Sequence, residues 1–206
     1  MLYSKNHIFK KIKQRFSSMD IDLILNKIHS LPEDSAKVLK SYITEVSYTK
    51  GHILLDTKTV EKNIFFIKKG IVRAFARTPD NDITFWLGRE GETILSMKSY
   101  VAHEKGYETI ELLEDGDLYQ LNTVDLNLLY EKDIHIANWG RKFAEQELLK
   151  TEERLISRQF KTASERYKAL LTENPDLIQR VQLGYIASYL GITQVSLSRI
   201  RAEIKL

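Results

Sequence analysis

The chain of 206 residues contains no cysteine. This absence excludes disulfide bonds, thiolate zinc sites, cysteine-bound iron–sulfur clusters and a thiol nucleophile. It fits a cytoplasmic protein, which is the location that we expect.

Long hydrophobic runs are also lacking. No apolar stretch approaches the length of a membrane-spanning helix, so we expect no membrane partner. The first 16 residues are basic but lack the apolar core of a secretory signal. Hydrophobic residues make up 43% of the chain, an ordinary share for a globular protein, and the length suits one large domain or two small ones.

Residue groupings that are typical of catalysis are missing. The five histidines are spread so that no two lie within four residues of each other: His7, His29, His52, His103 and His135. Metal enzymes built on a β-roll need closely spaced histidine ligands. No G-x-S-x-G, H-E-x-x-H or phosphate-binding G-K-S/T sequence occurs either. We therefore expect no catalytic residues, no metal site and no cofactor, in a protein that is not an enzyme.

Positive charge is unevenly placed, although the formal net charge is only +3. From Lys150 onward, ten Lys and Arg stand against six acids, a net charge of +4, whereas the first 149 residues carry −1. A basic end on a near-neutral body favours a polyanionic partner at that end. A mildly basic, solvated helical surface is the alternative explanation.

Helical and strand-like patterns follow one another along the first two thirds of the chain. Residues from about 19 to 42 have apolar side chains at helical spacing, and Pro32 opens a second segment. From about 43 to 121, short runs rich in β-branched and aromatic residues alternate with turn residues, and residues 78–82 (TPDND) are the expected tip of a hairpin. Many short strands at this spacing predict a sandwich, a jelly roll or a barrel.

Helical periodicity dominates after Asn122. A long helix is expected from about 134 to 160, and Pro175 is expected to close a further helix. Five residues of the long helix follow the 7-4-3-4 spacing of a coiled-coil seam: Ala137, Ala144, Leu148, Thr151 and Leu155. A second apolar set occupies another face: Ile136, Phe143, Leu149, Ile156 and Phe160. Two faces predict two partners, the β block and a second copy of the chain, while one broad face packed within the monomer is the alternative.

The stretch IASYLGITQVSLSRIR, residues 186–201, has the pattern of a helix-turn-helix. Ala187 supplies the small residue that lets the second helix cross the first closely, and Gly191 tolerates the positive φ that the turn requires. Thr193 is a suitable N-cap for the second helix. Apolar residues are spaced for burial on both helices: Ile186, Leu190, Ile192, Leu197 and Ile200.

The opposite face of the second helix suits DNA. It would carry Thr193, Gln194, Val195, Ser196, Ser198, Arg199 and Arg201. In the major groove, Arg199 can form a bidentate pair with guanine and Gln194 can pair with adenine. Thr193 and the backbone N–H groups after it suit a phosphate. A plain helical hairpin packed on a core is the alternative, because small-residue crossings and glycine turns occur there too.

This order of segments, together with the terminal motif, resembles the Crp/Fnr family of bacterial transcription regulators. The resemblance covers residues from about 19 to 202. VSYTKGHILLDTKTVEKNIFFIKKGIVRAF resembles the first half of the family's β-roll, and ELLEDGDLYQL resembles its last strands. IASYLGITQVSLSRIR is the most specific piece of the match.

The resemblance implies an α+β fold in three parts. An antiparallel, jelly-roll-like β-roll of the cyclic-nucleotide-binding type would span residues 1–133, a dimerisation helix 134–160, and a winged-helix-like domain with the helix-turn-helix 161–206. A homodimer would then bind a palindromic operator in double-stranded DNA, with RNA polymerase as a further candidate partner. Because the chain stops soon after the motif, any wing would precede it, as a short strand around residues 178–181.

The segment equivalent to the family's ligand site departs from the cyclic-AMP motif. Family members that bind cyclic AMP carry a Gly-Glu pair and, later, an Arg followed by a small hydroxyl residue. Here the Gly-Glu position falls on Leu95, Ser96 and Met97, and the Arg position on Gly106 or Tyr107. An anion buried without a forked cation is poorly compensated. We therefore expect no useful affinity for cyclic AMP. The sequence does not identify the effector. The candidate pocket segment consists of Leu95, Ser96, Met97 and Tyr107.

The histidines and a cluster of acidic residues each have more than one possible interpretation. Some members of the family sense gases through haem, so a single haem-binding histidine stays open. Five acids cluster near a strand pair: Glu108, Glu111, Glu114, Asp115 and Asp117. A metal site is conceivable there, but we favour a solvated hairpin edge, because charges at strand edges discourage aggregation.

The DNA-contacting face also departs from the family pattern. Active members usually place Arg, Glu and a later Arg there, where this chain has Gln194, Val195 and Arg199. Val195 cannot accept a hydrogen bond, although it can contact a thymine methyl, so the preferred half-site should differ. We expect a homodimeric, sequence-specific DNA-binding transcription regulator with a β-roll effector domain. The alternative is a β-roll sensor or adaptor that acts through protein contacts.

Overall fold

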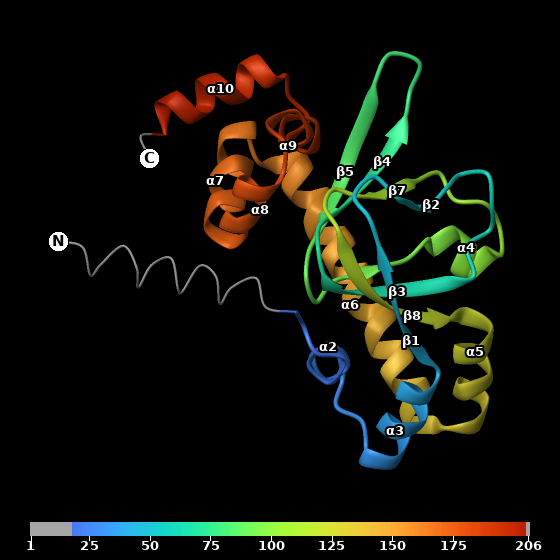
Figure 1. Ribbon diagram of the computed structural model, residues 1–206. Coiled ribbons are helices and arrows are strands. Elements are labelled where there is room, and N and C mark those ends of the chain that lie inside the picture. The colour runs from blue at the N-terminus through green and yellow to red at the C-terminus, as the bar shows by residue number, and fades with distance from the viewer. Residues whose placement is uncertain (1–17, 205–206) are drawn as a thin grey trace.

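The computed structural model describes residues 18–204, in which a β-roll, a long helix and a group of shorter helices follow one another (Figure 1). Before the β-roll lie α2 (Ile21–Ile28) and α3 (Glu33–Ser41). Asp20 caps α2 by accepting a hydrogen bond from Asp22 N at 2.8 Å, and Pro32 directly precedes α3. Both helices that the apolar spacing predicted are therefore present.

Eight strands among the described residues form two antiparallel, four-stranded sheets. Their bounds are β1 (Ile43–Tyr48), β2 (Ile53–Leu55), β3 (Asn63–Lys69), β4 (Val72–Arg77), β5 (Asp82–Gly88), β6 (Thr93–Ile94), β7 (Thr109–Leu112) and β8 (Gly116–Asn122). The strand orders are β1-β8-β3-β6 and β2-β7-β4-β5. Every pair in these sheets is antiparallel, which confirms the antiparallel, jelly-roll-like β-roll that the resemblance implied.

Strand β3 is buried on both of its faces. Phe65 and Ile67 face the second sheet and join the core between the two sheets. Ile64 and Phe66 point to the opposite side, where they pack with Trp139 of the long helix. Successive side chains of a strand alternate between its faces, so a strand buried on both sides has a continuous apolar run.

Two turns fix the geometry of the roll. Residues 78–81 join β4 to β5, and Thr78 N donates to Asn81 O at 2.9 Å, which confirms the predicted hairpin tip. Gly70, between β3 and β4, has a φ of +120°, and a Cβ there would lie 3.1 Å from the Cα of Gly116. Only glycine combines this backbone conformation with so close an approach of two chain segments.

A short helix that the sequence pattern did not predict interrupts the β block. This helix, α4, spans Met97–Ala102, and Ser96 caps it by accepting a hydrogen bond from Ser99 N. Six residues are too few to display a helical apolar period, which explains why the pattern missed it. After β8, α5 spans Thr123–Lys132 and leads directly into α6 (Ile134–Phe160).

Helix α6 has the bounds that its periodicity predicted, and its first half lies against the β-roll (Figure 1). Ile136, Trp139 and Phe143 are buried there. The indole N–H of Trp139 donates to the carbonyl of Leu25 at 3.1 Å, so α2 is tied to α6 as well as to the sheet. The second half of α6 leads to the group of shorter helices (Figure 1). It carries exposed apolar side chains.

Four helices follow α6: α7 (Ala163–Glu173), α8 (Pro175–Arg180), α9 (Leu183–Leu190) and α10 (Gln194–Glu203). The short strand expected around residues 178–181 is wrong, because helix α8 occupies this stretch. Pro175 does not close the preceding helix but stands in the first turn of α8, where its fixed φ and missing N–H are tolerated. Over residues 161–204, the structure contains helices only, so a β wing is absent from this part.

In the part of the chain that the structure covers, residues 18–204, no helix combines the length and apolar character needed to cross a bilayer.

Candidate nucleic-acid interface

Helices α9 and α10 meet at a turn whose conformation depends on Gly191. This residue has a φ of +69° and ends α9, with Ile192 N donating to Ala187 O at 3.0 Å. The left-handed conformation is unfavourable for residues with a Cβ, so glycine lets the chain turn sharply after α9. Thr193 then caps α10, because its Oγ1 accepts a hydrogen bond from Ser196 N at 3.1 Å.

The apolar sides of the two helices are buried together. Ala187 is buried where α10 approaches α9, and Leu197 is the buried centre of α10. Ile186 and Leu190 pack in the same core cluster, while Ile192 and Ile200 lie half-buried at its edge. The helix-turn-helix pattern in the sequence is thus present as a packed unit.

The polar face of α10 is open to solvent. Six of the seven residues expected to contact DNA are exposed, namely Thr193, Gln194, Val195, Ser198, Arg199 and Arg201, and Ser196 is half-buried because it takes part in the N-cap. Val195 retains 63% of its accessible surface. Nothing in residues 18–204 packs over this face. Helix α10 itself lies on the side of the helical group away from the β-roll (Figure 1).

Basic side chains around α10 divide into two groups. Arg166, on α7, donates to the carbonyls of Leu190 and Lys161, so it closes the C-terminal end of α9 and has a structural role. Arg199 and Arg201 form no ion pair with any side chain in residues 18–204. Their guanidinium groups are therefore available to an anionic partner.

The second half of α6 presents an apolar strip. In the predicted seam, Leu148 is 71% exposed and Leu155 63% exposed, Ala144 and Thr151 are also exposed, and Ala137 is half-buried. The second apolar set divides in two. Ile136 and Phe143 are buried against the β-roll, whereas Leu149, Ile156 and Phe160 are exposed beside the seam. Large apolar side chains gathered on one exposed helix are typical of an interaction surface.

An ion cluster joins the helical group to the β-roll. Arg180 of α8 forms a bidentate pair with Glu90, with nitrogen–oxygen distances of 2.7 and 3.0 Å, and also bonds Glu114. Asp176 approaches Arg180 at 3.8 Å and pairs with Arg89 at 3.0 Å. Burial alone would raise the pKa of Glu90, but the hydrogen bonds from Arg180 and from Gly70 N outweigh it and hold that pKa below its usual value.

The β4–β5 hairpin provides a second contact between the two parts, and it lies beside α9 in Figure 1. Ser188 of α9 accepts a hydrogen bond from Thr84 N at 2.9 Å and donates to Asp82 O at 3.2 Å. Sequence reasoning did not identify these contacts, because the partners lie more than 100 residues apart in the chain. No local pattern signals such a pairing.

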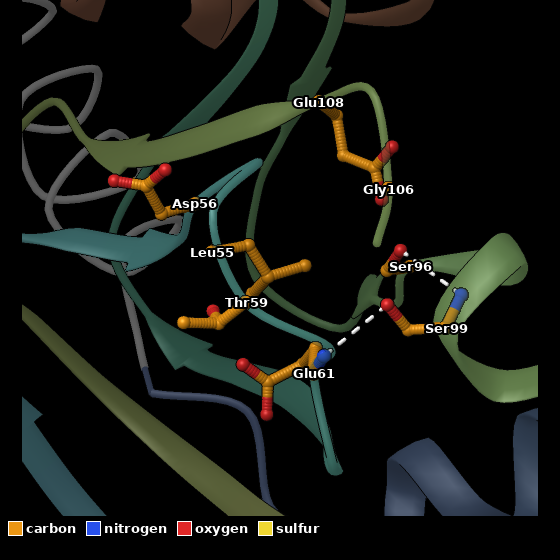
Figure 2. A pocket seen from close by; sticks show the side chains of 8 residues that line it. All are labelled: Leu55, Asp56, Thr59, Glu61, Ser96, Ser99, Gly106 and Glu108. Carbon is orange, nitrogen blue, oxygen red and sulfur yellow. Dashed lines mark hydrogen bonds between the residues drawn. The ribbon is translucent and has the colours of Figure 1, made fainter. Parts of the chain in front are cut away.

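The predicted ligand segment lies at a small hollow in the β-roll (Figure 2). Ser96 lines this hollow, whereas the side chains of Met97 and Tyr107 are exposed and Leu95 packs into the core next to α6. Their contact with a ligand stays a prediction. Gly106, one of the two positions equivalent to the family's Arg, also lines it, and residues that the sequence did not single out complete the wall, among them Asp56, Glu61 and Ser99.

The acidic cluster is only in part the solvated edge that we favoured from the sequence, because Asp115 is exposed and the other four acids are partly or fully buried. Glu108 is buried at the hollow, Glu111 pairs with Arg73 at 2.9 Å, and Glu114 bonds Arg180. Asp115 and Asp117 accept hydrogen bonds from Lys50 N and Ser47 Oγ. Within the described residues, no group of three or more His, Cys, Asp or Glu is placed to hold a metal ion.

The histidines give no sign of a ligand site in the described part of the chain. His29, His52, His103 and His135 are all exposed, and His7 lies outside the described residues. His52 stacks on Tyr48, with ring centroids 4.2 Å apart, which accounts for its orientation.

Comparison with known proteins bears on the fold. No protein-family model and no curated protein sequence matches the chain. Among solved structures, a protein described as a transcriptional regulator of the Crp/Fnr family from Eubacterium rectale is similar, with a TM-score of 0.66, 15% identity, and coverage of 85% of this chain and 84% of that one.

Two further solved structures agree with this match. FixK2 from Bradyrhizobium japonicum has a TM-score of 0.63 and 19% identity, over 79% of this chain and 84% of its own. A mutant of CooA from Carboxydothermus hydrogenoformans has a TM-score of 0.63 and 18% identity, over 92% of this chain and 87% of its own. The chain therefore shares the fold of these proteins, a β-roll followed by a long helix and a helical group, as the resemblance of its sequence implied.

Proposed function

We propose that the protein is a sequence-specific DNA-binding transcription regulator that acts as a homodimer. The observation that carries this proposal is the exposed polar face of α10. The opposite side of α10 is buried, and the turn at Gly191 and the N-cap Thr193 fix where the helix begins. A helix mounted in this way can enter the major groove without disturbing its own packing. The shared fold adds support.

The residues of this face have distinct roles in the proposed complex. Arg199 forms the bidentate pair with guanine, Gln194 pairs with adenine, and Val195 contacts a thymine methyl. The hydroxyl groups of Thr193 and Ser198 and the guanidinium of Arg201 bind phosphates, which fixes the register of the helix on the duplex. The preferred half-site therefore contains a guanine near the position of Arg199.

The dimer would form along α6, through Ala137, Ala144, Leu148, Thr151 and Leu155. A two-fold axis along this seam would present two copies of α10 to one face of the duplex, about one helical turn apart, and would require a palindromic operator. We divide the chain accordingly into an effector domain (1–133), a dimerisation helix (134–160) and a DNA-binding domain (161–206). RNA polymerase would be a further partner, and the protein would act in the cytoplasm.

The effector domain would act without cyclic AMP and without a bound cofactor. No Lys or Arg is among the residues that line the hollow at the equivalent segment, so a phosphodiester there would have no cation to compensate its charge. A ligand of a different class would instead bias the angle between the two copies of the DNA-binding domain. Such a bias needs a difference in ligand affinity between the two arrangements.

Fluorescence anisotropy with labelled DNA tests the proposal. Sites selected from random DNA should share a palindrome, and the affinity should fall steeply with salt, on the order of one unit of log–log slope per phosphate contact. A β-roll adaptor that acts through protein contacts would bind the same DNA weakly, with no preferred site. Absence of a selected sequence at low salt would overturn the proposal.

A further inference from the structure

The last turn of α6 lies beside the turn that leads into α10. A Cβ built on Gly191 would lie 3.6 Å from a guanidinium nitrogen of Arg158, so the side chain of Arg158 reaches the turn itself. Arg166 joins the same two segments, because it donates hydrogen bonds to the carbonyls of Lys161 and Leu190. The end of α6 and the start of α10 are therefore neighbours in space, although they are far apart in the chain.

The guanidinium of Arg158 is exposed and has no acidic partner in the part of the chain that the structure describes. Neither an ion pair nor a side-chain hydrogen bond joins it to another described residue. Other basic residues of the same helix are paired: Arg141 with Glu145, and Lys150 with Glu147 at 2.6 Å. Because a guanidinium stays charged at neutral pH, Arg158 is available to an anionic partner.

Arg158 also occupies the next position in the spacing of the α6 seam. Thr151 and Leu155 are four residues apart, and a further step of three, as the coiled-coil repeat requires, ends at Arg158. In the proposed dimer, the two copies of Arg158 would therefore lie near the two-fold axis. Their charges would repel each other there, and an anion beside them would remove this repulsion.

The same two-fold axis would pass through the centre of a palindromic operator. Helix α6 runs from beside the β-roll to the group of shorter helices, so its last turn is the end of the seam that lies nearest to α10 (Figure 1). The two copies of α10 would enter the half-sites on either side of the axis. Arg158 would then face the backbone of the DNA between the half-sites.

We infer that Arg158 binds a phosphate of double-stranded DNA between the two half-sites, one phosphate for each copy of the chain. A guanidinium binds phosphate oxygens through two parallel N–H groups, and such a contact carries no base preference. It holds the turn before α10 at a fixed distance from the backbone, so Arg158 positions the helix whereas Arg199 contacts bases. The inference rests on the proposed function, including its dimer.

The salt dependence of DNA binding by the full chain tests the inference. Each phosphate contact contributes about 0.9 to the log–log slope of affinity against salt, and Arg158→Ala removes one contact from each copy, so the slope should fall by about 1.8. Between about 50 and 200 mM salt, the wild type should therefore lose roughly 12-fold more affinity than the variant. The preference for the selected site should not change, because no base contact is lost.

Two further variants and a modified operator separate charge from structure. Arg158→Lys keeps the charge and should keep most of the slope. Arg141→Ala, at an exposed arginine in the first half of α6, is the matched control and should bind like the wild type. Uncharged methylphosphonates in place of the phosphates between the half-sites should weaken the wild type more than Arg158→Ala. The same replacement outside the half-sites should weaken both proteins equally.

The outcomes distinguish this inference from the proposed function. A purely structural role of Arg158 at the turn would lower the affinity of Arg158→Ala by the same factor at every salt concentration, which would overturn the inference. An unchanged slope in Arg158→Ala would also overturn it, and would leave the proposed function intact as long as the wild type binds its selected site. If the wild type binds no DNA in a salt-dependent manner, both are wrong.

Discussion

The guanidinium carbon of Arg73, on β4, lies 4.0 Å from the ring centroid of Tyr185, on α9. Arg73 is buried, and it also donates to Thr84 Oγ1 at 2.8 Å and to Glu111 Oε1 at 2.9 Å. A charge that is fixed inside the β-roll is thus in contact with the first helix of the helix-turn-helix. We expect changes in the roll that move β4 to alter the position of α9 through this contact.

Replacement of Tyr185 tests that coupling. Tyr185→Leu keeps the apolar volume but removes the aromatic face, so we expect a loss of about 1–2 kcal/mol in the free energy of unfolding. Hydrogen exchange should become faster in both β4 and α9. Tyr42→Leu, at an exposed tyrosine of the N-terminal region, serves as the control and should change neither. Unchanged exchange in α9 of Tyr185→Leu would show that the contact does not join the two parts.

The ion pair between Arg180 and Glu90 should make the stability of the protein pH-dependent. The pKa of Glu90 is held below its usual value of 4.5, so the unfolded chain takes up this proton before the folded chain does. The stabilisation is therefore complete above about pH 4.5 and is lost as the pH falls through the folded-state pKa.

Comparison with Glu90→Gln isolates this effect. At neutral pH, the wild type should be more stable than the variant by about 1.5–3 kcal/mol, because a charged hydrogen bond is lost. Denaturant unfolding between pH 3 and 7 should show that the difference shrinks on acidification. A difference that grows as the pH falls would contradict the assigned sign.

The exposed seam of α6 should control the association of the chain. Leu148→Glu places a charge in the proposed interface, so we expect dissociation to the 24.0 kDa monomer in sedimentation experiments, whereas the wild type should sediment at twice that mass. Val124→Glu alters an equally apolar, exposed residue on α5 and should leave the dimer intact. Dissociation in both variants, or in neither, would count against the seam.

Arg199 should carry base preference. Arg199→Ala should reduce the discrimination between selected and random DNA by roughly 1–3 kcal/mol, because a bidentate contact with guanine is lost. Lys132→Ala removes the same charge at the far end of the β-roll and should preserve the preference. Anisotropy titrations of both variants distinguish base recognition from non-specific attraction. If Arg199 contributed only through its charge, Arg199→Ala would lower the affinity for all DNA sequences equally.

Cyclic AMP should not bind. Titration calorimetry of the full chain with cyclic AMP at concentrations up to about 1 mM should give no saturable heat, since a phosphodiester gains no cationic partner in the hollow. Micromolar binding of cyclic AMP would refute the charge argument.

Local sequence was sufficient for the helix-turn-helix. Gly191 and Thr193 were identified because a positive φ and an N-cap each demand particular residue types, and the apolar spacing around Leu197 defined the buried side. The absence of a wing was not predictable in this way. Whether Pro175 ends one helix or begins the next depends on the packing of its neighbours, because proline is tolerated in the first turn of a helix and is common just after one.

The sequence by itself determined the order of the main segments (two helices, a β block, the long helix α6 and the helix-turn-helix), the turn before α10 and the polar character of its exposed face, because each of these follows from residues a few positions apart. Only the tertiary structure decided that Arg180 meets Glu90, that Arg73 contacts Tyr185 and that Glu108 lies buried with an unpartnered oxygen. Such contacts join residues brought together by the closure of the β-roll and the docking of the helices. Charge and burial at these positions depend on the whole chain, and no local period encodes them.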